Sequence, residues 1–373
     1  MNVLLTLGRM PKGLELARGL KAAGCTVFVA DPHKNHVCRH SNVVTKSIQV
    51  TAPNVSETGY LDDMIAAVQT HDIELVIPVS EESVYAAKLI ARLPDGVQFF
   101  GPTFETARDL HDKLRFNQLA AAHGLSVPTS ARLGSPEADA IVAASDVIIK
   151  PIHASAGIDI ETVPKGSSLP ASRPRPSLVQ QKICGRLLSC LSLARDGQCL
   201  GTAVYEGTIF SGSVAIAFQR AADSAPVEAW AARFIKAAGY NGFISFDMFI
   251  EDDGQAYAIE CNPRLTSGIH LFDNADLARA AITPDRRAPV QFRTRQAFQH
   301  FWPCLGVTEM ALIKGGFREK FHHFIRSADI TWSGKDIMPF VMMNFCSMEI
   351  LKNCWRGQMS LGEAAITDVE WRG

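Results

Sequence analysis

The sequence predicts a multidomain protein of the α/β and α+β classes, with a parallel α/β domain at the N-terminus followed by a strand-rich region. Its 373 residues are enough for two or three domains. Over the first hundred residues, short apolar runs alternate with segments of helical periodicity, which is typical of a parallel sheet covered on both faces. From residue 177 to 251, strand patterns dominate and a single helix interrupts them.

The first hundred residues divide into four expected strands and three expected helices. The strands are expected at Val3–Leu7, Thr26–Ala30, Leu75–Val79 and Val97–Phe100, and the helices at Lys12–Ala23, Tyr60–Thr70 and Glu81–Arg92. In parallel sheets, ligands bind at the carboxyl ends of the strands. The polar residues after these strands are therefore candidates for a substrate site: Ser80, Glu81 and Glu82, and more weakly Arg9 and Asp31. A competing interpretation makes the two glutamates the charged first turn of a helix.

The remaining elements follow from the same periodicities. Helices are expected at Asp112–His123 and Pro226–Ala238, and strands at Asp146–Pro151, Ile158–Val163, Phe243–Glu251, Gln255–Cys261 and Ile366–Trp371. Four prolines between residues 164 and 176 predict a surface loop. The segment after residue 275 has weak signals and stays unassigned.

Composition excludes several classes of protein. The formal net charge of −1 gives no global field for nucleic acid or for an anionic membrane. No apolar run is long enough to span a membrane, and the apolar N-terminus lacks the basic region of a signal peptide. Nine cysteines without a CxxC pair indicate free thiols in a reducing compartment. We therefore expect a cytoplasmic protein that acts on small molecules, with neither a nucleic-acid nor a membrane partner.

The glycine-rich stretch after the first strand is not a phosphate loop. Gly8 and Gly13 have the right spacing, but Leu14 and Glu15 follow where a lysine and a hydroxyl residue are required.

The strand pair near residue 250 carries the strongest chemical signal. Asp252-Asp253-Gly254 is a hairpin turn between two strands. Period-two alternation places Glu260 and Asn262 on one face, and antiparallel pairing can bring Asp247 beside them. Two carboxylates and an amide oxygen form a hard oxygen site suited to Mg²⁺ shared with phosphates. Arg264, two residues further, can hold an anionic oxygen. The competing interpretation is a hairpin whose acids face solvent.

Asp247 and the string Ile259-Glu260-Cys261-Asn262-Pro263-Arg264 resemble the metal hairpin of the ATP-grasp superfamily, an acidic residue followed by E-x-N-P-R. The resemblance covers residues 1 to 275 and is nearest to the carbamoyl-phosphate-synthase-like and carboxylate–amine ligase branch. It implies a pre-ATP-grasp domain over 1–102, two ATP-grasp subdomains over 103–183 and 184–275, and a C-terminal extension over 276–373. A packing lid or a dimer surface is the expected role of the extension.

The resemblance also implies roles for individual residues. Arg264 and Lys150 would be catalytic, and Asp247, Glu260 and Asn262 would hold the metal. The residues that it assigns to ATP are Lys113, Lys150, Ser155, Gly157, Gln180, Gln181, Lys182 and Ile183. Those that it assigns to an acceptor pocket are Ser80, Glu81, Glu82, Ser267, Gly268 and His270.

Three features depart from the family pattern. Gln181 stands where an acid is usual, and Leu187 stands where the family places a ribose-binding glutamate. The loop after Lys150 keeps only Gly157 instead of two or three glycines. These departures put nucleotide affinity in doubt more than chemistry.

The implied activity is that of an ADP-forming ligase that uses ATP with Mg²⁺ or Mn²⁺. A substrate carboxylate would be activated as an acylphosphate and then joined to an amine or a thiol. The partners would be small-molecule carboxylate and amine substrates, and a homodimer stays open. Two alternatives are an ATP-grasp kinase of a small molecule and a non-catalytic nucleotide-binding protein.

Overall fold

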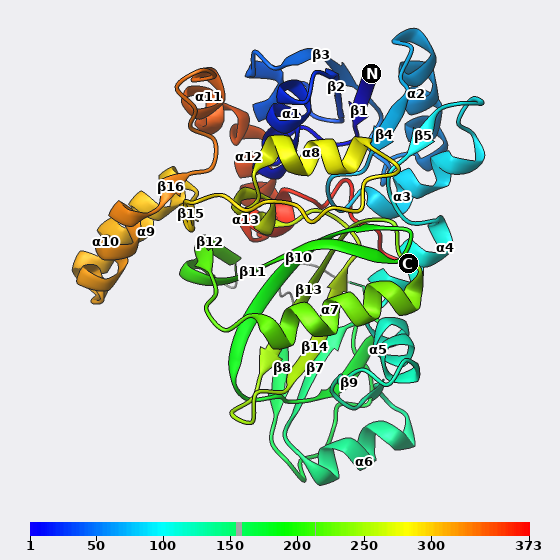
Figure 1. Cartoon of the computed structure of the whole chain (residues 1–373). Helices are drawn as coiled ribbons and strands as arrows, with labels where there is room; N and C mark the ends of the chain where they lie inside the picture. Colours follow the sequence, from blue (N-terminus) through cyan, green and yellow to red (C-terminus); the bar gives the residue numbers. More distant parts are fainter. Residues whose placement is uncertain (154–158, 213) are drawn as a thin grey trace.

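The computed structural model describes residues 1–153, 159–212 and 214–373, so the expected nucleotide residues Ser155 and Gly157 lie outside it. Within the described residues the strands form three sheets (Figure 1). These sheets fall mainly within the segments 1–102, 103–183 and 184–275, and two short strands from the C-terminal segment join the third sheet.

The N-terminal sheet is parallel throughout, in the order β3-β2-β1-β4-β5. Its strands are β1 (Asn2–Leu5), β2 (Thr26–Asp31), β3 (Val44–Gln49), β4 (Leu75–Ile77) and β5 (Gln98–Phe99). The helical elements of this region are α1 (Pro11–Ala22), η1 (Val37–His40), α2 (Glu57–Thr70), α3 (Ser83–Ala87), η2 (Lys88–Ala91) and α4 (Phe104–His111).

Both faces of this sheet are buried, as its continuous apolar strands predicted. Val3 and Leu5 pack in one core with Leu14 of α1. Leu4, which points the other way, packs with Tyr60 of α2. The alternation of β1 between two cores confirms the parallel α/β class of the N-terminal region.

Two expected elements of this region differ in the structure. Strand β3 was not expected, because its sequence is polar and half exposed. The helix expected over Glu81–Arg92 begins at Ser83 and tightens into the 3₁₀-helix η2. Glu81 and Glu82 therefore precede the helix, and the interpretation of them as its charged first turn is wrong.

The second sheet has the order β6-β9-β7-β8, and its paired strands are antiparallel. It consists of β6 (Ser130–Arg132), β7 (Val147–Pro151), β8 (Glu161–Val163) and β9 (Ser177–Gln181), with the helices α5 (Lys113–Ala122) and α6 (Pro136–Ala144). The residues from 164 to 176 contain neither helix nor strand, which confirms the expected loop.

The third sheet is the largest, with the order β14-β13-β10-β11-β12-β15-β16. Its strands are β10 (Arg186–Arg195), β11 (Gln198–Ser211), β12 (Val214–Arg220), β13 (Gly242–Ile250), β14 (Ala256–Asn262), β15 (Ala297–Gln299) and β16 (Ala328–Asp329). Helix α7 (Ala225–Ala238) lies across one face (Figure 1), where Trp230 and Phe234 pack on Phe246. Short η3 (Ser267–Leu271) and α8 (Asn274–Ile282) follow β14.

The C-terminal segment is mostly helical. It contains α9 (Phe301–Lys314), α10 (Phe317–Arg326), α11 (Met338–Cys346), α12 (Met348–Gly357) and α13 (Leu361–Ala364). Helices α9 and α10 project from the body as an arm (Figure 1). The strand expected at Ile366–Trp371 is wrong: these residues form turns, and Ile366 and Val369 are buried in the core that contains α1. Their apolar spacing reflects packing against the N-terminal domain.

Candidate functional site

A cavity of about 260 Å³ lies between the second sheet and the strand pair β13–β14. Its lining includes seven residues that the sequence analysis assigned to the nucleotide or metal: Lys113, Lys150, Gln180, Gln181, Lys182, Ile183 and Glu260. The unusual Leu187 also lines it. Ile148, Phe249 and Ile259 complete apolar walls, so the cavity combines a hydrophobic slot with buried charges.

Lys150 is positioned by β7, next to the last residue of that strand. Its buried Nζ donates a hydrogen bond of 3.0 Å to the carbonyl of Ile259. Burial lowers the pKa of this ammonium to about 8, although the Glu260 carboxylate opposes the shift. An anion in the cavity would stabilise the charged form further.

Lys113 is the first residue of α5. Asp112 caps this helix, because its Oδ1 accepts hydrogen bonds from the N–H groups of Leu114 and Arg115. The cap fixes where the helix begins and directs Lys113 toward the strand pair. Its Nζ lies 3.8 Å from Oε1 of Glu260.

The strand pair β13–β14 brings the two expected metal carboxylates together. Asp247 pairs directly with Glu260, and Ser245 pairs with Asn262. Directly paired residues of antiparallel strands share a face, so the side chains of Asp247 and Glu260 are neighbours. A register shift leaves Ile259 without a partner on β13, and its carbonyl receives the hydrogen bond from Lys150.

The electrostatics of this pair suit a divalent cation. Burial, and then repulsion from Glu260, raise the pKa of Asp247 to about 6, although Ser189 Oγ donates a 2.5 Å hydrogen bond to its Oδ1. A cation between two carboxylates would relieve that repulsion. In the described part of the chain, no group of three or more His, Cys, Asp or Glu side chains is placed to hold a metal. The donor set fits a site of two carboxylates completed by neutral oxygens.

Asn262 directs its amide oxygen away from those carboxylates. Its Oδ1 accepts a 2.9 Å hydrogen bond from Arg264, and its Nδ2 lies 3.5 Å from Oδ2 of Asp247. Metal ligation by Asn262 would therefore require its amide to turn. The Arg264 side chain, which is 11% exposed, also forms a 2.5 Å ion pair with Glu81, while its Nε has no hydrogen-bond partner among the described residues.

In the loop after β4, Glu81 lies at the candidate site, whereas Glu82 forms hydrogen bonds that hold the loop itself. Burial would raise the pKa of Glu81, but the adjacent Arg264 guanidinium lowers it, so Glu81 stays ionised beside the hairpin. Glu82 instead turns back into the domain, where its Oε1 accepts hydrogen bonds from the backbone of Val79 and Ser80 and from Thr6. Ser80 Oγ is buried without a hydrogen-bond partner among the described residues.

Two residues of the expected acceptor pocket have a structural role. A Cβ on Gly268 would lie 2.7 Å from Cβ of Leu191, so this glycine permits close packing against β10. Buried His270 is engaged by α1, with its Nδ1 3.1 Å from Oε2 of Glu15. The assignment of these two residues to an acceptor pocket stays a prediction. Ser267 begins η3 and is partly exposed.

Lys12 and His111 were missed by the sequence analysis and lie beside Arg264 and Glu81. Lys12 Nζ donates a 2.9 Å hydrogen bond to the carbonyl of Leu265, and burial, with the charge of Arg264, lowers its pKa to about 7. Burial lowers the pKa of His111 to about 4, which keeps the ring neutral. Lys12 follows the first strand of a parallel sheet, and that position was the available signal.

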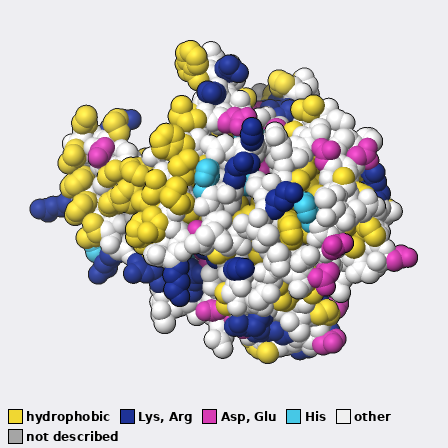
Figure 2. Space-filling view, turned by 90° about the horizontal axis from the view of Figure 1, so that it is seen from above, with side chains coloured by type: hydrophobic (Ala, Val, Ile, Leu, Met, Phe, Trp, Pro, Cys, Tyr) yellow, Lys and Arg dark blue, Asp and Glu magenta, His cyan; other side chains and the backbone are white. Residues whose placement is uncertain are grey.

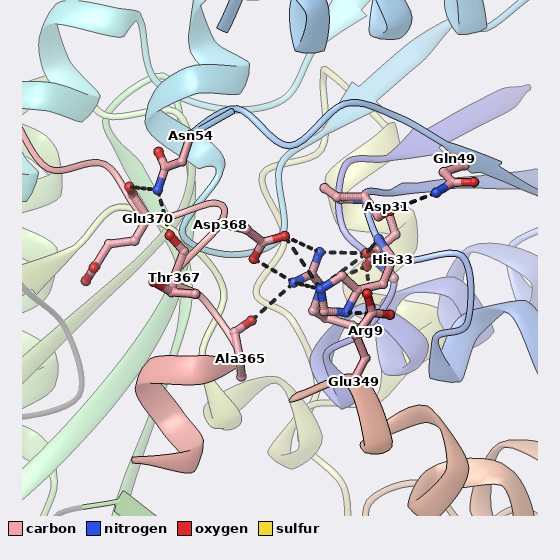
Figure 3. A network of polar contacts seen from close by, with 12 residues as sticks. Arg9, Asp31, His33, Gln49, Asn54, Glu349, Ala365, Thr367, Asp368 and Glu370 are labelled. Atoms are coloured by element: carbon pink, nitrogen blue, oxygen red, sulfur yellow. Dashed lines mark hydrogen bonds and ion pairs between the residues drawn. The ribbon is translucent and has the colours of Figure 1, made fainter. Parts of the chain in front are cut away.

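The weaker candidates Arg9 and Asp31 pair with each other, and Arg9 also pairs with the C-terminal segment (Figure 3). Arg9 Nη2 lies 2.8 Å from Oδ1 of Asp31, and its Nη1 lies 2.7 Å from Oδ1 of Asp368. Asn54 donates hydrogen bonds to the carbonyls of Thr367 and Glu370. This edge of the N-terminal sheet is therefore closed by residues 365–370.

Comparison with known proteins finds a family match for the central region. A family model described as ATP-grasp domain matches residues 110–268. Among the curated proteins no match was found. None of the described helices combines the length and the apolar character needed to cross a membrane.

Solved structures share the fold at low sequence identity. N5-carboxyaminoimidazole synthetase from Staphylococcus aureus has a TM-score of 0.63 and 13% identity, over 84% of this chain and 86% of that chain. Biotin carboxylase from Campylobacter jejuni has a TM-score of 0.61 and 16% identity, over 78% and 73% of the chains. Carboxyaminoimidazole ribonucleotide synthase from Aspergillus clavatus, complexed with ATP, has a TM-score of 0.61 and 15% identity, over 80% and 81%.

Proposed function

We propose that this chain is an ATP-dependent ligase that activates a small-molecule carboxylate and joins it to an amine or a thiol, because residues 110–268 match the family model of the ATP-grasp domain. The observation that carries the proposal is the position of the cavity. It has apolar walls and two buried lysines, and it includes one member of the carboxylate pair. ADP and phosphate are the expected products.

ATP is the proposed occupant of the cavity. The apolar walls suit a flat aromatic base, and the cations of Lys113 and Lys150 suit its phosphates. The lowered pKa of Lys150 supports this role: burial disfavours its ammonium, and a phosphate bound beside it would stabilise that charge. The structurally similar synthase from Aspergillus clavatus was solved with ATP.

Asp247 and Glu260 would hold Mg²⁺ or Mn²⁺, and Asn262 would join them if its amide turned. When bound, the metal would neutralise negative charge on the phosphates and orient them. The raised pKa of Asp247 supports this assignment, because burial and the Glu260 carboxylate disfavour its negative charge and a bound cation would offset both effects.

The proposed reaction has two balanced steps. An oxygen of the substrate carboxylate attacks the γ-phosphorus, the bond to ADP breaks, and an acylphosphate forms. The nitrogen of the amine then attacks the acyl carbon, phosphate leaves, and the amine loses a proton. Lys150 and Arg264 would offset the negative charge that develops in each step. The acceptor would lie where Arg264, Glu81 and Lys12 meet.

Hydroxylamine tests this proposal, because it traps acylphosphates as hydroxamates. We expect ADP release and hydroxamate formation when the enzyme, ATP and Mg²⁺ are incubated with pools of candidate carboxylates and hydroxylamine. ADP release with a stable phosphoester product would indicate the kinase alternative. ATP binding without ADP release from any pool would favour the non-catalytic alternative, which Gln181 and Leu187 suggest.

A further inference from the structure

The C-terminal helices expose an unusual amount of apolar surface. Among the described residues, fourteen of the twenty-two exposed large hydrophobic side chains lie between Trp302 and Trp355. Trp355 is 87% exposed, Ile313 is 84% exposed and Leu312 is 66% exposed. Figure 2 shows these side chains as a broad hydrophobic patch on the side of the molecule that carries the arm. We call this surface the C-terminal patch.

The extent of the C-terminal patch exceeds that of ordinary monomer surfaces. Five of the fourteen side chains are Phe or Trp, which carry roughly 150–250 Å² each, and nine are Leu, Ile, Val or Met; together their exposed parts present on the order of 1,000 Å² of apolar surface. The largest patch on a typical soluble monomer covers about 300–600 Å². A surface of this extent indicates that something covers it.

Helices α10 and α12 have the architecture of helices that lie at an interface. Neither contains a buried residue. In α10, Phe321 and Ile325 are exposed one turn apart; in α12, Leu351 and Trp355 are exposed in the same way. Aromatic and aliphatic residues on one face, with lysine and arginine on the other, are typical of helices that insert into the boundary of a lipid layer.

The charges around the C-terminal patch are mainly positive. Six cations on α9–α12 and their connections are exposed: Lys314, Arg318, Arg326, Lys335, Lys352 and Arg356. Only three acids of this segment are exposed: Glu309, Glu319 and Glu349. In the described part of the chain, no ion pair joins any of the six cations to a carboxylate. Figure 2 shows Lys and Arg side chains along the border of the patch.

We propose that the C-terminal patch binds an anionic lipid surface, with its tryptophan, phenylalanine and aliphatic side chains in the interfacial layer and its border cations on the headgroups. A two-fold dimer through the patch would set this cationic border against itself, and like charges across an interface are unfavourable. This surface could not be predicted from the net charge of −1, because the acids elsewhere in the chain balance its cations. The cations become neighbours only in the folded structure.

Vesicle sedimentation of the full-length protein tests the proposal. We expect wild type to sediment with vesicles that mix phosphatidylglycerol and phosphatidylcholine, and to remain in solution with phosphatidylcholine alone. The double variant Leu312→Gln with Ile313→Gln should bind the mixed vesicles at least about tenfold less. Val55→Gln is the matched control, because Val55 is 81% exposed outside the patch; it should bind as wild type does.

A second readout follows the exposed tryptophans. Their emission should shift to the blue on mixed vesicles, and Trp355→Phe should reduce that shift while sedimentation persists. Wild type that stays in solution with both kinds of vesicle would overturn the proposal. So would equal losses of binding in the double variant and in the control. A dimer in solution that the double variant dissociates, without any vesicle binding, would assign the surface to a second copy instead.

Discussion

Burial governs the ionisation of the charged residues around the cavity. It lowers the pKa of Lys150 to about 8 and that of Lys12 to about 7, and it raises the pKa of Asp247 to about 6. Burial thus makes each charged form less favourable, and a bound anion beside the lysines or a bound cation beside Asp247 would offset this effect. These residues come from three elements that are far apart in the sequence, and such clustering of shifted groups is typical of functional sites.

Part of this site could be predicted at the level of single residues. Period-two alternation and a hairpin turn were enough to pair Asp247 with Glu260. The amide orientation of Asn262 could not be predicted, because it depends on Arg264. The role of His270 could not be predicted either, because its partner Glu15 is 255 residues away in the sequence.

Glu260→Gln should separate chemistry from folding. The change is nearly isosteric and leaves the strand pair intact, but it removes a proposed metal charge. We expect ADP release in the hydroxylamine assay to fall at least about 100-fold, the scale of lost electrostatic stabilisation. Coupled ADP assays at limiting Mg²⁺, with thermal melts, measure both effects.

Cys261→Ala provides the matched control from the next position on the strand. Cys261 points into the core that contains Phe246, so its truncation should lower the melting temperature and leave turnover per folded molecule unchanged. Normal turnover of Glu260→Gln at limiting Mg²⁺ would place the metal elsewhere.

Leu187→Glu tests the altered ribose position. Leu187 is 49% exposed and lines the cavity, so a glutamate there can remain solvated and stability should change little. We expect ATP to bind about 1 kcal/mol more tightly through a ribose hydroxyl, the scale of one hydrogen bond. Titration calorimetry with ATP measures this. A large loss of stability would show that Leu187 is a core residue and that the ribose position is assigned to the wrong residue.

At the level of elements, buried apolar strands were predictable and half-exposed ones were not. Strands β1, β2 and β4 were expected because their apolar runs cross a sheet covered on both faces. Strand β3 is an edge strand with polar, exposed positions, so it carried little signal. Residues 366–371 were expected to form a strand because Ile366 and Val369 give them an apolar spacing; both side chains are instead buried in the core that contains α1.

Helix α1 is anchored through Glu15 to His270 of η3 and to Arg293, which precedes β15. Burial alone would raise the pKa of Glu15, but hydrogen bonding to His270 and the charges of His270 and Arg293 lower it to about 2. A folded-state pKa below the unfolded value of 4.5 stabilises the protein above that pH. This stabilisation is lost as the pH falls from about 4.5 toward 2.

Glu15→Gln should therefore lower the free energy of unfolding at neutral pH by about 3 kcal/mol, which corresponds to the shift in pKa. The difference from wild type should shrink as the pH falls toward 2. Denaturant unfolding across this range measures it, with the exposed Glu105→Gln as control. A difference that is constant with pH would contradict the assigned ionisation.

At the level of the whole molecule, the C-terminal segment contacts two distant parts of the chain. Strand β15 extends the third sheet beside β12, and the tail returns to Arg9 in the N-terminal domain. The sequence could not show this, because weak periodicity says nothing about a partner more than 350 residues away. The C-terminal residues thus cover the carboxyl ends of strands in the first sheet.

Asp368→Ala tests this closure. Arg9 donates two hydrogen bonds to the Asp368 carboxylate, at 2.7 and 3.0 Å, and their loss should lower the free energy of unfolding by about 1.5–3 kcal/mol. Asp252→Ala in the exposed hairpin turn should have no comparable effect. Equal denaturation midpoints for both variants would show that the tail is not held by Arg9.

The central claim is that the cavity between the second sheet and the β13–β14 pair binds ATP through Lys150. Calorimetric titration of ATP with Mg²⁺ into wild type, Lys150→Ala and the exposed control Lys165→Ala tests it most directly, without knowledge of the other substrates. We expect Lys150→Ala to weaken ATP by about 1.5–3 kcal/mol, the scale of a hydrogen bond to a charged group, and Lys165→Ala to bind as wild type does. Unchanged ATP affinity in a folded Lys150→Ala variant would contradict the account.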